Sequence, residues 1–295
     1  MIDLHTHTTV SDGGDSPSEL VAKAAAVGLE AIAVTDHDND AGCDEAVAAG
    51  REHGVEVVRG VEISCDVEKL LEQGYEPSSR PTMHLLGYFI PEGDNPLSNA
   101  LAGLQRHRAD RNRLIVERLN ELGIPVTFEE VEREAGGPGS QIGRPHFAAA
   151  LVRHGAVSEY QEAFDHYLAK GAKAYVSRKL YRPQEAVELM LSAGVVPVLA
   201  HPFTLNLGME DLERFVDSLL EVGLKGIEGY HGDLPESDQQ PFRALGRQRG
   251  LIVSGGSDYH GDMRPDRGLP GGRHHVLCPE EVLDELRNVA ESLPA

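Results

Sequence analysis

Residues 2–38 read IDLHTHTTVSDGGDSPSELVAKAAAVGLEAIAVTDHD, and this stretch predicts how most of the chain folds. Residues 2–4 form an apolar strand, residues 16–28 a helix and residues 29–34 a second apolar strand. The helix begins at Ser16 with the sequence SPSE, in which a capping serine, a proline and a glutamate have the spacing of a helix start. The stretch therefore predicts one strand–helix–strand unit.

The same alternation of strand and helix returns along most of the chain. Further strands are predicted at residues 55–63, 83–90, 195–200, 226–229 and 251–254. Repeated units of this kind over 295 residues favour a parallel α/β barrel or a doubly wound sheet. Residues 96–182 instead have mainly helical periodicity. We therefore predict an α/β fold formed by residues 1–95 and 183–295, with a mainly helical lid inserted at residues 96–182.

Composition limits the location and the partners of the protein. The chain starts without the apolar core of a signal peptide, and its three cysteines form no CxxC pair, which predicts a cytoplasmic protein that does not bind membranes. A formal net charge of −21 opposes binding to long duplex nucleic acid. Residues 100–182 hold 13 Lys and Arg against 10 Asp and Glu, which suggests a local anion site. Four arginines of this segment are interpreted as the solvated face of a helix: Arg106, Arg108, Arg111 and Arg113.

Histidines and carboxylates stand at or near the ends of the predicted strands, where α/β folds place their chemistry. His5 and His7 alternate in an extended segment, so both rings can face one ion. Asp12 follows in a Ser-Asp-Gly-Gly segment, where ordinary turn chemistry is the alternative. His37 ends the second strand after Asp36, which could instead cap the next helix.

Later strands repeat the pattern. Glu62 lies inside an apolar strand, where a carboxylate is costly unless it is paired or bound to metal. His201 ends a very apolar strand, while His84 begins its strand and could be a structural histidine. Asp258 and His260 are two residues apart at the last strand end, as His5 and His7 are at the first.

Together these positions predict a metal centre of nine ligands: His5, His7, Asp12, His37, Glu62, His84, His201, Asp258 and His260. Nitrogen and oxygen donors without sulfur suit Mn²⁺, Zn²⁺ or Fe²⁺, of which Mn²⁺ is preferred here. Nine ligands exceed the number that one ion binds, so two or three divalent ions are expected. Centres of this kind are typical of enzymes that hydrolyse phosphate esters.

Six segments in this order, HTHTTVSDG, VTDHD, GVEIS, HLLGY, AHP and GSDYH, resemble the PHP (polymerase and histidinol phosphatase) family. The resemblance implies a distorted seven-stranded (βα) barrel with its metal cluster at the C-terminal ends of the strands. It implies that Glu62 bridges two ions and assigns the other ligands to three ions: His5, His7 and Asp258 to one, His84 and His201 to a second, and Asp12, His37 and His260 to a third.

The insertion adds candidate phosphate contacts. GRPHF at residues 143–147 and KGAKAYVSR at residues 170–178 resemble a bacterial subgroup that includes nucleoside 3′,5′-bisphosphate phosphatases, which also act on AMP, and 5′→3′ exoribonucleases. The candidates are Arg144, His146, Lys170, Lys173 and Arg178. A surface ion pair is the alternative for Arg144. His231 could be a general acid or substrate contact, or an exposed loop residue.

The sequence therefore predicts a metal-dependent phosphoesterase that hydrolyses phosphate monoesters of nucleotides by a metal-bridged hydroxide. The predicted catalytic residues are Glu62, His201, Asp258 and His231. One alternative is a 5′→3′ exoribonuclease that acts on short RNA, and another is a metal-binding module without catalysis. An amidohydrolase-type barrel is disfavoured, because no lysine was found on a predicted barrel strand.

Overall fold

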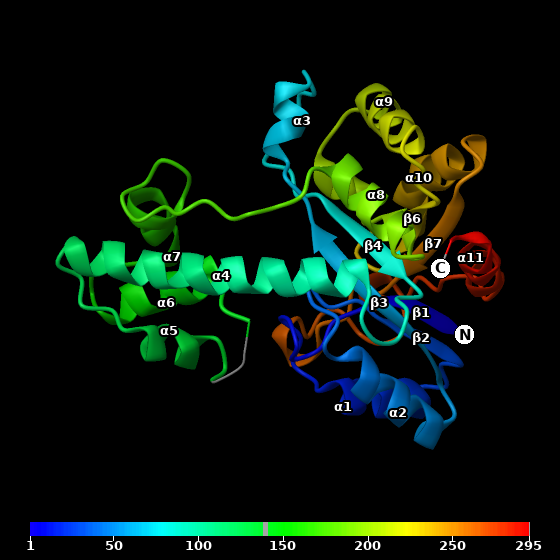
Figure 1. The fold of residues 1–295 in the computed structure, drawn as a ribbon, viewed down its shortest axis with the longest axis horizontal. Helices are drawn as coiled ribbons and strands as arrows, with labels where there is room; N and C mark the ends of the chain where they lie inside the picture. Colours follow the sequence, from blue (N-terminus) through cyan, green and yellow to red (C-terminus); the bar gives the residue numbers. More distant parts are fainter. Residues whose placement is uncertain (138–140, 295) are drawn as a thin grey trace. The chain divides into compact units, whose positions relative to one another are not determined.

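The computed structural model describes residues 1–137 and 141–294, and the chain divides into two compact units (Figure 1). The first unit consists of Met1–Leu101 and Leu180–Ala295, and the second of Ala102–Lys179. Among the described residues, no helix is both long enough and apolar enough to cross a membrane.

The first unit is an α/β fold built on one seven-stranded sheet in the order β1 to β7. Its strands are β1 (Ile2–Thr6), β2 (Ala31–Val34), β3 (Glu56–Ser64), β4 (His84–Tyr88), β5 (Val196–Leu199), β6 (Gly226–His231) and β7 (Ile252–Gly256). Its helices are α1 (Pro17–Ala26), α2 (Cys43–His53), α3 (Glu68–Glu72), α8 (Pro183–Ser192), α9 (Met209–Leu220), α10 (Glu236–Gln248) and α11 (Glu281–Ser292). The predicted α/β class and the strands are confirmed.

One strand runs against the expected direction. β4 is antiparallel to both β3 and β5, whereas the other neighbouring strands are parallel, so the expectation of an entirely parallel sheet is wrong here. The reason is the connection at residues 65–83, which returns the chain to the edge where β3 ends, so that Ser64 pairs with His84. The first residue of β4 therefore lies at the same edge as the last residues of the parallel strands.

The sheet nearly closes into a barrel where β1 approaches the end of β7. The backbone N–H of His7 donates to the carbonyl of Tyr259 at 2.8 Å. The carboxylate of Asp3, which is buried, accepts from the N–H of Ser257 at 2.9 Å. A side chain at Gly256 would place its Cβ 2.4 Å from the backbone nitrogen of His5, so only glycine permits this approach.

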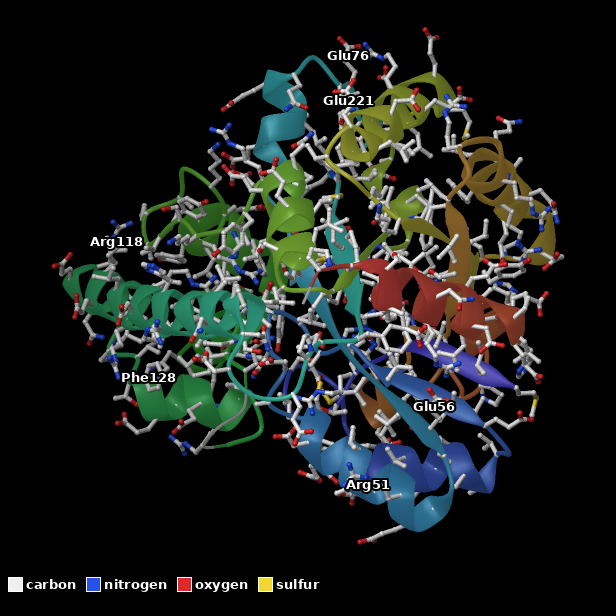
Figure 2. The ribbon with its side chains drawn as sticks, turned by 45° about the vertical axis from the view of Figure 1, so that its right-hand side comes forward. Arg51, Glu56, Glu76, Arg118, Phe128 and Glu221 are labelled. Carbon is white, nitrogen blue, oxygen red and sulfur yellow. The ribbon has the colours of Figure 1, made fainter. Side chains whose placement is uncertain are left out.

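Apolar side chains cover both faces of the strands. Alternate residues of β1, β2, β4 and β5 pack with α11 in one core cluster, and Ile32 and Val34 of β2 pack with α1 and α2 in another. α1 and α2 lie side by side in Figure 1. The side chain of Glu56, labelled in Figure 2, accepts a hydrogen bond at 2.7 Å from Arg287 of α11. The predicted capping box at Ser16 is also confirmed, since its side chain and that of Glu19 cap each other's backbone N–H groups.

The second unit is helical. It contains most of α4 (Pro96–Glu121), then α5 (Phe128–Glu134), α6 (Arg144–Arg153), α7 (Tyr160–Ala163) and the π-helical turn η1 (Phe164–Leu168). Figure 2 labels Arg118 on α4 and Phe128 at the start of α5. A separate core holds these helices together, with Leu119, Phe147 and Leu151 fully buried. The role of this segment as a lid stays a prediction.

Arg111 of α4 corrects one interpretation of the sequence. Arg106 and Arg113 are exposed, as expected for a solvated helix face, but Arg111 is only 6% exposed. Burial, together with the nearby positive charges of Arg108, Arg178 and Arg144, lowers the pKa of its guanidinium to about 9. The second unit therefore gathers three partly exposed arginines around one buried arginine.

Candidate metal centre

The nine predicted ligands come together at the edge of the sheet where the parallel strands end. Each of them belongs to a group of side chains whose ligand atoms lie within 4.8 Å of one another. These groups are His5–His7–Asp258, His7–Asp12–His37–His260, His5–Glu62–His201 and His37–Glu62–His84, and a further group joins His5 with Glu228 and His231. The assignment of each residue to a particular ion stays a prediction, but several buried clusters that could hold metal ions are present.

Glu62 is at the centre of these groups. Five histidine nitrogens surround its two carboxylate oxygens at 2.7–3.4 Å, those of His5, His7, His37, His84 and His201. A carboxylate offers about four lone-pair sites to hydrogen-bond donors. Hydrogen bonding alone therefore does not account for the arrangement, whereas nitrogens and oxygens that share a cation would lie at such distances.

Unpartnered buried atoms support the same interpretation. Within residues 1–137 and 141–294, several nitrogens and one oxygen of this cluster have no hydrogen-bond partner: Nε2 of His5, both nitrogens of His7, Nδ1 of His37, Oε2 of Glu62 and Nε2 of His260. Buried polar groups without partners are rare and costly. The donor set of imidazoles and carboxylates fits divalent ions such as Mn²⁺, Zn²⁺ or Fe²⁺.

Hydrogen bonds on the far side of three rings leave a lone pair facing the cluster. Nδ1 of His5 donates to Glu228 at 3.0 Å, and Nδ1 of His260 donates to the carbonyl of Asp258 at 2.8 Å. Nδ1 of His201 lies 2.9 Å from the hydroxyl of Thr204, whose own proton can go to a neighbouring carbonyl. When the rings are neutral, as in a metal-bound site, each Nε2 is then the unprotonated nitrogen that can bind metal.

His231 has the opposite arrangement. The backbone N–H of Asp233 donates to its Nδ1 at 3.1 Å, so Nδ1 is an acceptor and the proton of the neutral ring is on Nε2. Burial lowers the pKa of His231, which favours this neutral form. Nε2 is buried without a hydrogen-bond partner in the described part of the chain. His231 therefore presents an N–H group rather than a lone pair.

The charges of the cluster balance one another. Burial raises the pKa of the Glu62 carboxyl, but the surrounding histidines outweigh it and hold that pKa well below its usual range. Burial lowers the pKa of His7, but the carboxylates of Asp258 and Glu62 outweigh it and raise the pKa to about 10. Protons on these rings stand where bound cations would supply the positive charge, since ligand histidines bind metal in the neutral form.

Two predicted ligands sit on unusual backbone conformations. His201 has a φ of 25° and Asp258 a φ of 53°, a region that non-glycine residues rarely adopt. Such strain persists where surrounding structure enforces it, and it concentrates at functional sites. In His201 the backbone N–H also donates to Glu228 at 2.7 Å, which holds the residue in place.

A cavity of about 170 Å³ opens onto the cluster. The predicted ligands His37, Glu62, His84, His201, Asp258 and His260 line it. His231 lines it as well, next to the ring of Phe203, whose centroid lies 5.0 Å from that of His231. The three predicted catalytic residues that are also ligands thus share this cavity with His231, while their catalytic roles stay predictions.

Sequence reasoning missed two residues of this region. Glu228 is 1% exposed on β6 and accepts from both His5 and the backbone of His201. The signal that identified Glu62, a carboxylate inside an apolar strand, was present for Glu228 too. Arg267 pairs with Asp258 and Asp233, but it comes from an irregular loop, where no periodic pattern indicates which side chains turn inward.

The five predicted phosphate contacts lie in the second unit. Arg144 begins α6 and donates to the carbonyl of Leu168 at 3.4 Å, and Nδ1 of His146 accepts from the backbone of Gly143 at 3.0 Å. Lys170, Lys173 and Arg178 follow η1 in turns and irregular backbone. Their binding of substrate stays a prediction.

Comparison with known proteins agrees with this geometry. The model of the PHP domain family matches residues 3–245. The 3′,5′-nucleoside bisphosphate phosphatase of Chromobacterium violaceum is 33% identical over 88% of this chain and 87% of its own length. The 5′-3′ exoribonuclease Rnm of Escherichia coli is 33% identical over 88% of this chain and 84% of its own.

A solved structure extends the likeness to the fold. An amidohydrolase from Chromobacterium violaceum, with bound sulfate and no metal, superposes with a TM-score of 0.75 and is 31% identical, covering 98% of this chain and 96% of its own. The family match, the strand topology and the buried histidine and carboxylate clusters all agree. This chain belongs to the PHP domain family and is a metal-dependent phosphoesterase of that family.

Proposed function

We propose that the enzyme hydrolyses phosphate monoesters of nucleotides, with 3′,5′-bisphosphonucleotides and AMP as its substrates. The observation that carries the proposal is the cavity at the cluster. Its volume of about 170 Å³ is well below that of pockets that enclose a whole ligand, roughly 300–1,000 Å³. A terminal phosphate group fits a space of this size, and the nucleoside would stay outside it.

Two or three divalent ions, Mn²⁺ first among them, would be held by the nine nitrogen and oxygen ligands around Glu62. When bound, such ions supply a nucleophile at neutral pH and neutralise negative charge on the phosphoryl oxygens. Glu62, His201 and Asp258 would fix the positions of the ions relative to one another. Their buried, strained and hydrogen-bonded positions support a rigid site of this kind.

His231 would act directly on the substrate. The ring lines the cavity, and its proton is on Nε2 because the backbone of Asp233 occupies Nδ1. This N–H can donate to the oxygen that leaves with the nucleoside, or transfer its proton to that oxygen as the ester bond breaks. His5, His201 and His260, the three ligand histidines whose Nδ1 partners are described above, do not have this arrangement.

The second unit would bind the rest of the nucleotide. Arg144, His146, Lys170, Lys173 and Arg178 would contact a phosphate that is not hydrolysed, and residues 96–182 would serve as the substrate lid. The likeness to a bisphosphate phosphatase supports a second phosphate in the substrate. The positive charge around Arg111 supports an anion in this unit.

The direct test measures phosphate release from four compounds, with Mn²⁺ and with a chelator. The panel is adenosine 3′,5′-bisphosphate, AMP, histidinol phosphate and a 5′-phosphorylated RNA tetramer. We expect the bisphosphate to be the preferred substrate and the chelator to abolish its hydrolysis. Preference for histidinol phosphate, or activity that survives metal removal, would refute the proposal.

Substitution of Arg144 tests the second phosphate. Arg144→Ala should raise KM for the bisphosphate about tenfold or more and change that for AMP much less, because a lost charged hydrogen bond costs about 1.5–3 kcal/mol. Arg153→Ala is the matched control, since Arg153 ends the same helix and pairs with Glu134 at the surface. Equal changes in KM for both substrates in Arg144→Ala would show that Arg144 does not bind the second phosphate.

A 5′→3′ exoribonuclease is the second candidate, favoured by the likeness to Rnm and by the positive charge of the second unit. Stepwise release of mononucleotides from the RNA tetramer would support it. Affinity for RNA should then fall steeply with salt, with a slope that grows with oligonucleotide length. A salt slope independent of length would favour the monoester reading.

A further inference from the structure

Two arginines, Arg264 and Arg267, line the cavity at the metal cluster. Both come from the loop that follows β7, and neither belongs to the predicted ligands or phosphate contacts. The other charged groups among its described lining residues include the carboxylates of Glu62, Asp233 and Asp258. A phosphate that enters this cavity meets these negative charges. Whether an arginine can bind it depends on whether its guanidinium is already paired with a carboxylate.

Arg267 forms ion pairs with two carboxylates. Its guanidinium donates to Oδ2 of Asp258 through Nη1 and to Oδ2 of Asp233 through Nη2, and its side chain is 13% exposed. The other oxygen of Asp258, Oδ1, lies 3.2 Å from Nε2 of His7. Arg267 therefore occupies the outer oxygen of Asp258 and leaves the inner oxygen turned toward the histidines.

Arg264 has no such close pair with Asp258. Its Nη1 lies 3.7 Å from Oδ2 of Asp258, beyond hydrogen-bond distance, and its side chain is 41% exposed. Its backbone is fixed, because its N–H donates to the carbonyl of Gly261 at 3.0 Å and closes the short 3₁₀ turn η3 (Gly261–Met263). The residue thus combines an anchored backbone with a guanidinium that lines the cavity and keeps N–H donors for a ligand.

A guanidinium suits this position. Its planar fork matches two oxygens of a phosphate, and such charge-assisted pairs are shorter and stronger than neutral hydrogen bonds. Arg264 and His231 both line the cavity, so a phosphate bound in it would lie near both side chains. The charge of Arg264 would also offset the nearby carboxylate of Asp258.

We propose that Arg264 binds the terminal phosphate of the substrate in the cavity, and that Arg267 is a positioning residue that keeps Oδ1 of Asp258 turned toward the histidines. The two roles differ in what they touch. Arg264 contacts the substrate, whatever the rest of that substrate is, while Arg267 acts through Asp258. The proposal holds for any phosphate ester and so does not depend on the nucleotide proposed above.

The test measures binding of inorganic phosphate to the Mn²⁺-loaded full chain by calorimetry. Arg264→Gln should raise the Kd for phosphate about tenfold, because a charge-assisted pair is lost at a partly exposed site. Arg264→Lys should give a smaller increase, because lysine keeps the charge without the fork. Arg273→Gln is the matched control, since Arg273 lies in the same loop, is half-exposed and pairs with Asp266.

Manganese content and kinetics with p-nitrophenyl phosphate separate the two roles. Arg264→Gln should raise KM and retain manganese, because a contact to the substrate phosphate is lost while the metal ligands stay in place. Arg267→Gln should lower kcat and the manganese retained after gel filtration, by about tenfold or more for a residue that orients a ligand. The proposal is overturned if Arg264→Gln binds phosphate as tightly as Arg273→Gln, or if it loses manganese as Arg267→Gln does.

Discussion

The ends of β5 and β6 place two buried histidines side by side and give them opposite hydrogen-bonding states. His201 follows β5, its Nδ1 faces the hydroxyl of Thr204, and its Nε2, 2.7 Å from Glu62, would offer a lone pair to a cation shared with that carboxylate. His231 ends β6, its Nδ1 accepts from the backbone of Asp233, and its Nε2 keeps a proton. The two ring centroids are 5.9 Å apart.

The difference shows that the role of a histidine in this cluster depends on its outer nitrogen. We expect that a hydroxyl or carboxylate there leaves the other nitrogen free to bind metal, whereas a backbone N–H there leaves the other nitrogen protonated. Residue type and burial are the same at both strand ends, so neither distinguishes the two roles. Substitutions at each end should therefore have different consequences for metal content.

The largest effect is expected at the β5 end. His201→Ala removes a lone pair next to Glu62 and should lower kcat/KM by more than about a thousandfold, because a metal ion contributes several kcal/mol of transition-state stabilisation. Bound manganese, measured by elemental analysis, should fall as well, while circular dichroism should show an unchanged fold. Full manganese content in an inactive variant would remove His201 from the ligand set.

A smaller loss is expected at the β6 end. His231→Ala should lower kcat about 10²- to 10⁴-fold, the usual contribution of general acid catalysis, and should leave manganese content unchanged if Nε2 of His231 carries a proton rather than a lone pair, as its bond to Asp233 indicates. His231→Gln tests the nature of the donor, since its amide can hydrogen-bond but cannot give up a proton. Rescue by glutamine would identify a hydrogen-bond donor, and no rescue a proton donor. Loss of manganese from either variant would contradict the comparison.

An intermediate change at the β5 end should weaken metal binding without removing the ligand. Thr204→Val is close in shape and deletes the acceptor for Nδ1 of His201, so the ring can take the wrong tautomer. Manganese affinity should fall about 10- to 100-fold, measured by titration against a competing chelator. Thr9→Val, at an exposed threonine, is the control and should bind manganese normally. Equal affinity in both variants would mean that Thr204 does not orient His201.

Much of the fold could be predicted from periodicity, because buried parallel strands are short apolar runs and helix starts carry capping residues. The alternation of apolar strands and helices located all seven strands, and SPSE located the start of α1. The direction of β4 could not be predicted. It depends on the path of residues 65–83, and no local pattern of apolar residues encodes the side from which a chain re-enters a sheet.

Some residues of the site could likewise be predicted from the sequence, and others could not. Histidines at strand ends carry a signal because the strand pattern around them is strong, and the structure brings those residues together. Glu228 carried the same signal as Glu62. The tautomer of His231 could not be predicted, because it depends on a backbone N–H two residues further along, and every residue except proline has that group. The roles of Arg264 and Arg267 could not be predicted either, because irregular loops have no periodic pattern that shows which side chains point inward.

The smallest effect is expected from a change in the side chain of Asp233, whose backbone N–H bonds to His231. The group that holds Nδ1 of His231 is the backbone of Asp233, so Asp233→Ala keeps the N–H donor and should leave the ring protonated at Nε2. The nitrogen chemical shifts of His231, measured by NMR, should report the same tautomer in both proteins. Asp258 keeps its pair with Arg267, so kcat should stay within roughly threefold, in the range of a modest ion pair. A switch of the proton to Nδ1, with kcat as low as that of His231→Ala, would show that the carboxylate of Asp233 controls the ring.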